Sequence, residues 1–150
     1  MVFDMSGIEE YFHHCMYFTV SRLSRVVTRM AEEEFLITGL SPTYAFLLML
    51  VKDRPGISQK ELCEKLHIAQ STVTRFIDKL ESKKLVSRTV RGKNSFITLT
   101  SRGDVLQKDI AKAWKNFFCR YLKILGEKEA ARLTELTDMA GDKLEKGSSE

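Results

Sequence analysis

Five polar side chains stand within six consecutive positions near the middle of the chain, and each can hydrogen-bond to a nucleobase or a phosphate. They are Gln70, Ser71, Thr72, Thr74 and Arg75. Glutamine can pair through two hydrogen bonds with adenine, and arginine can do the same with guanine, while serine or threonine can reach a base or a phosphate. This set of residue types is typical of a surface that reads the edges of DNA bases.

Basic residues gather around this polar segment. The whole chain carries a formal net charge of +4, but residues 58–103 alone hold ten lysines and arginines against four acidic residues. Such a concentration of positive charge indicates an anionic partner, and nucleic acid is the commonest one. The side chains that we expect to add phosphate or groove contacts are Lys79, Arg88, Arg91, Lys93 and Asn94.

Two short helices joined by a tight turn are predicted to carry the polar segment. The first follows Ser58, which forms a capping box with Glu61, and it ends near His67. The second spans residues 70–84 and has one apolar face, made of Val73, Phe76, Ile77 and Leu80. Because the polar residues lie on the opposite face, the pair has the form of a helix-turn-helix.

A β-hairpin is predicted directly after the second helix. Residues 86–90 and 96–100 are rich in β-branched side chains that alternate with others, as in half-buried strands. The segment between them, residues 91–94, carries Arg91 and Lys93 and therefore makes a basic tip.

Long amphipathic helices are predicted on both sides of this module. Apolar residues recur every three to five positions over residues 8–35, which predicts one long helix. A shorter, almost entirely apolar helix is predicted over residues 43–52, after the start signal Ser41-Pro42. Two more helices follow the hairpin, and the first of them begins around Ser101.

The apolar stripes of these terminal helices need a surface to cover them. A module of about 60 residues buries little surface by itself, so the stripes either fold back on it or pair with a second copy. We prefer the second copy, because paired recognition helices read two half-sites. We therefore expect a mostly α fold with a small β-hairpin wing: a winged helix-turn-helix at residues 41–103, flanked by dimerisation helices at residues 1–37 and 104–147.

The central part of the chain resembles the MarR family of winged-helix regulators over residues 40–106. The motifs that carry the resemblance are Ser71-Thr72-Val73-Thr74-Arg75, Leu80-Glu81 followed by Leu85-Val86-x-Arg88, and Leu99-Thr100-x-x-Gly103. The resemblance implies a homodimeric transcriptional regulator, most commonly a repressor, which binds a pseudo-palindromic operator in double-stranded DNA. It also implies that the recognition helix enters the major groove and the wing the minor groove.

The wing tip departs from the family pattern. Family members usually carry an acidic-x-Arg motif there, on a loop about two residues longer, and this chain has Arg91-Gly92-Lys93-Asn94 instead. A minor-groove arginine therefore cannot be carried over by position, and Arg91 and Lys93 are nominated by their charge alone.

The resemblance also places effector pockets between the terminal helices and the winged module. For a small apolar or aromatic effector, the candidate side chains are Tyr11, Phe12, Cys15, Phe18, Tyr44 and Trp114. Aromatic residues at helical spacing are more often core residues, so a core role stays an alternative to an effector contact for each aromatic side chain. Cys15 resembles in its placement the reactive thiol of the family's organic-peroxide sensors, and thiol-based sensing is therefore an alternative.

Other classes of function find little support in the sequence. It contains no glycine-rich phosphate loop, nucleophile elbow or HExxH motif, so we expect neither an enzyme nor a cofactor. We expect no metal site, because the adjacent residues 13–16 point about 100° apart on a helix. Without a secretory signal or a long apolar run, a cytoplasmic location is expected. A winged helix that contacts only protein is the remaining alternative, and the basic excess argues against it.

Overall fold

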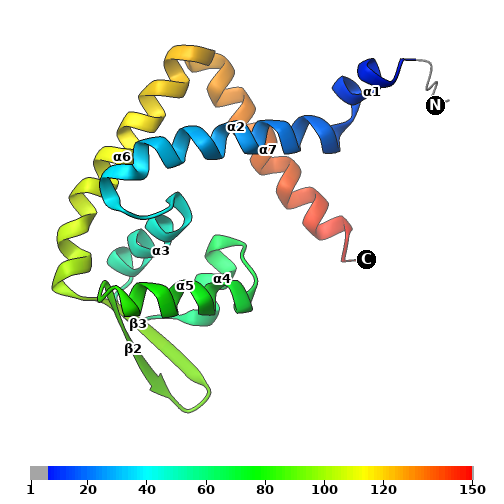
Figure 1. The fold of residues 1–150 in the computed structure, drawn as a ribbon. Helices are drawn as coiled ribbons and strands as arrows, with labels where there is room; N and C mark the ends of the chain where they lie inside the picture. The colour runs from blue at the N-terminus through cyan, green and yellow to red at the C-terminus, as the bar shows by residue number, and fades with distance from the viewer. Residues whose placement is uncertain (1–6, 150) are drawn as a thin grey trace.

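The computed structural model describes residues 7–149, which form a mostly helical chain with one small antiparallel sheet (Figure 1). The elements are α1 (Ile8–His14), α2 (Met16–Phe35), the short 3-10 helix η1 (Leu36–Thr38), α3 (Pro42–Asp53), β1 (Ile57–Ser58), α4 (Gln59–Leu66), α5 (Gln70–Ser82), β2 (Val86–Arg91), β3 (Asn94–Leu99), α6 (Ser101–Leu125) and α7 (Glu127–Gly147). The predicted fold class, mostly α with a hairpin wing, is confirmed. Residues 1–6, on which the expectation about a secretory signal depends, lie outside the described residues.

The hydrophobic core joins the helix-turn-helix to the base of the wing and to α3. Leu47, Leu48 and Val51 of α3 are fully buried, as the nearly all-apolar sequence of that helix predicts. They belong to one cluster with Ile77 of α5 and Ile97 of β3. The core therefore fixes the recognition helix and the wing relative to each other.

The N-terminal helix is not continuous, contrary to the prediction over residues 8–35. It breaks at Cys15, whose backbone is extended (φ −90°, ψ 118°) and which caps the start of α2. The hydroxyl and the amide of Thr19 both bond to the Cys15 carbonyl, at 3.1 and 3.0 Å. The apolar spacing continues across the break without a glycine or proline, so periodicity alone could not detect it.

The wing is a three-stranded sheet in the order β1-β3-β2. The predicted hairpin is present, but its tip is shorter than predicted, because Arg91 and Asn94 pair with each other in the ladder. Gly92, with a φ of 62°, makes the two-residue turn possible. Strand β1 was not predicted, since its two residues pair with Ile97 and Phe96 and have no strand pattern of their own.

The helix after the wing begins at Ser101, as predicted, and Thr100 occupies its N-cap position. The Thr100 hydroxyl accepts a hydrogen bond from the Gly103 amide at 3.1 Å and donates one to the Lys84 carbonyl at 2.6 Å. A single side chain thereby joins the end of the wing, the start of α6 and the loop after the recognition helix.

Helices α2, α6 and α7 form an arm that extends away from the winged module (Figure 1). Arg120 of α6 bonds to Glu33 of α2 at 2.6 Å and to Glu34 at 3.2 Å, and the bond to Glu33 raises the pKa of Arg120.

No single helix among residues 7–149 is long and apolar enough to cross a bilayer; only the bent pair Met16–Thr38 with Pro42–Asp53 has the length and composition.

Candidate nucleic-acid interface

Helix α5 is buried on one face and polar on the other, as predicted. Val73, Ile77 and Leu80 are fully buried in the core. The five polar residues of the predicted reading face divide into two groups: Gln70, Ser71 and Arg75 are exposed, while Thr72 and Thr74 are half-buried. Three of the five predicted reading residues are therefore accessible at the surface of α5.

A polar cleft of about 370 Å³ lies between the start of α4, the start of α5 and the wing. Its lining residues are Ser58, Gln59, Lys60, Gln70, Thr74, Arg88, Lys93, Asn94 and Ser95. Half of the predicted DNA-contacting residues are thus brought together in the cleft, and the other half, Ser71, Thr72, Arg75, Lys79 and Arg91, do not line it.

Four of the residues that line the cleft were not predicted, namely Ser58, Gln59, Lys60 and Ser95. Gln59 and Lys60 occupy the first turn of α4, directly after the Ser58 cap, whose hydroxyl accepts from the Glu61 amide at 3.1 Å. In a helix-turn-helix the start of the first helix lies beside the recognition helix. That geometry was the signal that could have identified these two side chains.

Arg88 has a protein partner instead of a free charge. Its guanidinium pairs with Asp78 of α5, and only 19% of its side chain is exposed. The Arg88 Nε atom is buried and has no hydrogen-bond partner in the described structure. Arg88 therefore holds β2 against the recognition helix and offsets an acidic group there, a structural role that the prediction of a phosphate contact did not include.

Two further basic residues of the predicted site lie over aromatic rings. The Lys79 ammonium is 5.5 Å from the centre of the Tyr44 ring, and the Arg91 guanidinium is 5.9 Å from that of Phe96. Such cation–π contacts restrain the long side chains and leave their charges at the surface. Lys93 and Asn94 are exposed at the wing tip, where Asn94 pairs with Arg91.

The six candidate effector residues are not brought together in one cavity. Phe12 stacks on Phe18 at 5.1 Å near the break at Cys15, and Tyr11 lies edge-on to Phe12 at 6.5 Å. Tyr44 packs on the recognition helix, 4.5 Å from Phe76.

Trp114, the only tryptophan of the chain, lies in a separate aromatic cluster on α6. Its ring is 4.5 Å from that of Phe35 and 4.3 Å from that of Phe46, and its indole N–H lies 3.0 Å from the Met49 sulfur. A surface cavity of about 370 Å³ borders Trp114, Phe117 and Tyr121.

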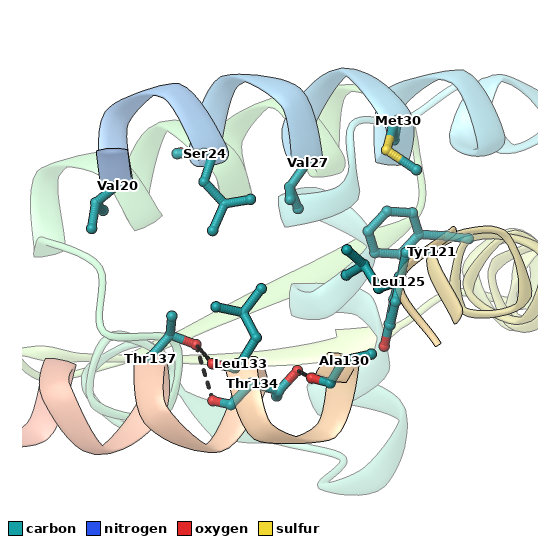
Figure 2. Close-up of a pocket in the computed structure, with 12 residues that line it drawn as sticks. Val20, Ser24, Val27, Met30, Tyr121, Leu125, Ala130, Leu133, Thr134 and Thr137 are labelled. Carbon is teal, nitrogen blue, oxygen red and sulfur yellow. Dashed lines mark hydrogen bonds between the residues drawn. The ribbon is translucent and has the colours of Figure 1, made fainter. Parts of the chain in front are cut away.

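An apolar groove of about 390 Å³ runs between α2, α6 and α7. Figure 2 shows Val20 and Val27 of α2 facing Tyr121 and Leu125 of α6 and Leu133 of α7. None of the six candidate effector residues lines this groove within the described part of the chain.

Comparison with known proteins relates the chain to one family by sequence and to one fold by structure. The sequence model of the MarR family matches residues 40–94. The HTH-type transcriptional repressor MdtR of Bacillus subtilis is 31% identical over 102 residues, which span 66% of this chain and 66% of MdtR.

Solved structures share the fold at lower identity. The repressor CouR bound to a 23-mer DNA duplex superposes with a TM-score of 0.76 at 21% identity, covering 93% of this chain and 99% of that one. CouR from Rhodococcus jostii RHA1 bound to p-coumaroyl-CoA gives a TM-score of 0.71 at 21% identity, covering 84% and 91%. At this identity the likeness establishes the fold alone.

Proposed function

The chain belongs to the MarR family, and from this premise we propose that it is a homodimeric, sequence-specific DNA-binding regulator that represses transcription. The observation that carries the proposal is the polar, exposed face of α5 beside a basic wing, on a helix whose other face is locked in the core. MdtR is named a transcriptional repressor and CouR is described as bound to DNA, which supports the same function here.

In this proposal α5 enters the major groove and the hairpin β2–β3 reaches the minor groove. Gln70, Ser71 and Arg75 meet base edges, because they are the exposed polar residues of the first turns of α5. Lys79, Arg91 and Lys93 neutralise phosphates on either side. A pseudo-palindromic operator then follows from the two-fold symmetry of a dimer.

A gel shift against the DNA upstream of the protein's own gene and of its neighbours tests the function. One of these fragments is expected to bind much more tightly than a scrambled fragment of equal length at the same salt concentration. Equal affinity for all fragments would contradict sequence-specific regulation, and no binding to any would contradict DNA binding altogether.

Replacing Arg75 by alanine is expected to weaken specific binding by roughly 1–3 kcal/mol, because a bidentate contact to guanine is lost. The measurement is a binding titration at fixed salt on the selected operator. Lys128→Ala, at the exposed start of α7 far from the wing (Figure 1), removes an equal charge and should leave the affinity unchanged. An equal affinity of Arg75→Ala and the wild type would remove Arg75 from the reading face.

Dimerisation through the arm is the second part of the proposal. Large apolar side chains are exposed on two of its helices: Val20, Val26 and Val27 on α2, and Leu133, Leu136, Met139 and Leu144 on α7. Monomeric proteins rarely leave contiguous apolar surface of this kind uncovered. A second copy of the chain covers it in this proposal, with residues 1–37 and 104–147 as the dimerisation region and residues 41–103 as the DNA-binding module.

Leu136→Glu is expected to convert the dimer to a monomer and to lower operator affinity by at least tenfold, since the two half-sites are then bound independently. Light scattering gives the mass and a gel shift gives the affinity. Ala131→Glu places the same carboxylate about 140° around α7 and should preserve the dimer. A monomeric wild type, or a dimeric Leu136→Glu variant, would contradict this interface.

Control by a small effector is the third part, and the CouR structure described with p-coumaroyl-CoA supports an aromatic ligand. Because Trp114 is the single tryptophan and borders a cavity, an aromatic acid bound there should change its fluorescence. The same acid should release the operator in a gel shift. Fluorescence that is unaffected by an acid that releases DNA would place the effector site elsewhere.

Thiol-based peroxide sensing through Cys15 stays a prediction.

A further inference from the structure

A chain of hydrogen bonds links the two helices of the helix-turn-helix at the edge of the polar cleft. The Gln59 side-chain amide donates to the Thr74 hydroxyl at 2.5 Å, and that hydroxyl donates to the Gln70 carbonyl at 2.9 Å. Gln59 and Thr74 are both half-buried, and all three residues line the cleft.

These bonds determine which group Thr74 can offer to a ligand. A threonine hydroxyl has one hydrogen to donate, and at Thr74 that hydrogen is used within α5. Its oxygen already accepts one hydrogen bond from Gln59 and keeps one lone pair. The Thr74 side chain therefore has no hydrogen left to donate to a base, and its methyl group is the part that makes no hydrogen bond.

The backbone that carries Gln59 is fixed from two sides. The preceding residue, Ser58, caps α4 through the Glu61 amide and pairs with Phe96 in the sheet. Gln59 therefore reaches Thr74 from an anchored position, and little side-chain entropy is lost when DNA binds. The bond to Thr74 is part of the folded structure before any ligand arrives.

We propose that Gln59 and Thr74 read DNA as one unit, in which Gln59 holds the Thr74 hydroxyl so that Thr74 contacts a thymine through its methyl group. This inference rests on the proposed DNA-binding function. In the major groove thymine displays a 5-methyl group, which apolar groups such as the threonine methyl can recognise. Gln59 is a positioning residue in this unit, and it lies outside the recognition helix where specificity is usually sought.

Thymidine and deoxyuridine differ only in that methyl group, so operators containing one or the other test the contact directly. Operators are first selected from a random duplex pool with the wild type, and each thymine is then replaced singly by deoxyuridine. At one position per half-site the replacement should weaken wild-type binding about fourfold, equivalent to about 0.8 kcal/mol for one buried methyl. Thr74→Val keeps the methyl and should retain this discrimination, whereas Thr74→Ser should lose it.

The reverse pattern, with discrimination kept in Thr74→Ser and lost in Thr74→Val, would overturn the inference and leave DNA binding intact. A wild type that binds no DNA would overturn the proposed function and the inference together. Equal unfolding midpoints of the two variants confirm that the comparison is between folded proteins.

The role of Gln59 is tested through its dependence on Thr74. Gln59→Ala frees the Thr74 hydroxyl and should relax the preference for thymine in a second selection, but it should have no such effect when Thr74 is already valine. Lys60→Ala, at the next position in the same cleft, should weaken binding to all sequences alike. Unchanged thymine preference in Gln59→Ala would show that Gln59 does not position Thr74.

Discussion

Replacing Gly103 with alanine is expected to lower the free energy of unfolding by roughly 3 kcal/mol or more, because the added methyl group collides with the backbone. A Cβ atom at Gly103 would lie 2.1 Å from the Leu85 carbonyl oxygen and 3.2 Å from a methyl carbon of Leu99. The Leu85 carbonyl accepts a hydrogen bond from the Thr100 amide at 3.1 Å. It therefore cannot move away without breaking the junction between the wing and α6.

Chemical denaturation followed by circular dichroism measures this effect. Gly141→Ala is the matched control: nothing lies within 4 Å of a Cβ at that position of α7, so alanine should stabilise the helix by about 0.5–1 kcal/mol. Equal stability of Gly103→Ala and the wild type would mean that α6 does not pack this closely on Leu85.

The same contact gives a physical reason for one of the motifs behind the family resemblance. In Leu99-Thr100-x-x-Gly103, Thr100 caps α6 and Gly103 allows the helix to approach Leu85. The pattern was visible in the sequence, but its cause was not. The cause is a contact between residues 18 positions apart, which no local pattern encodes.

The elements that could be predicted from the sequence are those with local signals. Ser58 caps α4, the apolar face of α5 is buried, and the wing strands pair as their alternation predicts. The break at Cys15 had no local signal such as a glycine or a proline, and strand β1 exists through its pairing with β3. The predicted wing tip, residues 91–94, was too long for a similar reason: Arg91 pairs with Asn94, and only two residues remain in the turn.

The candidate site could be predicted less completely than the fold. Residue types and charge nominated the exposed face of α5 as the reading face, which stays a prediction. They also treated Arg88 as a free cation, because its ion pair with Asp78, 10 positions away, cannot be seen in the sequence. Gln59 was missed because its role depends on a hydrogen bond to a residue 15 positions away. The effector candidates were chosen by aromatic character, which does not distinguish a shared cavity from separate packing clusters.

Operator affinity is expected to fall by about three orders of magnitude between 50 and 200 mM salt. If Lys79, Arg91 and Lys93 each neutralise one phosphate, a dimer releases counterions from about six phosphates, and the slope of log affinity against log salt is about −5. Titrations at several salt concentrations give this slope. A flat dependence, or no binding, would favour a winged helix that contacts only protein.

Replacing single charged residues then shows which of them contribute to the salt dependence. Lys93→Ala should make it less steep by about two, one phosphate in each half-site, and should weaken all sequences to a similar degree. Lys123→Ala, exposed near the far end of α6, should leave the slope unchanged. Lys93 lies at a wing tip that lacks the family's acidic-x-Arg motif, so a reduced slope would mean that the short tip binds DNA through charge. An unaltered slope in Lys93→Ala would instead remove Lys93 from the phosphate contacts and leave them to Lys79 and Arg91.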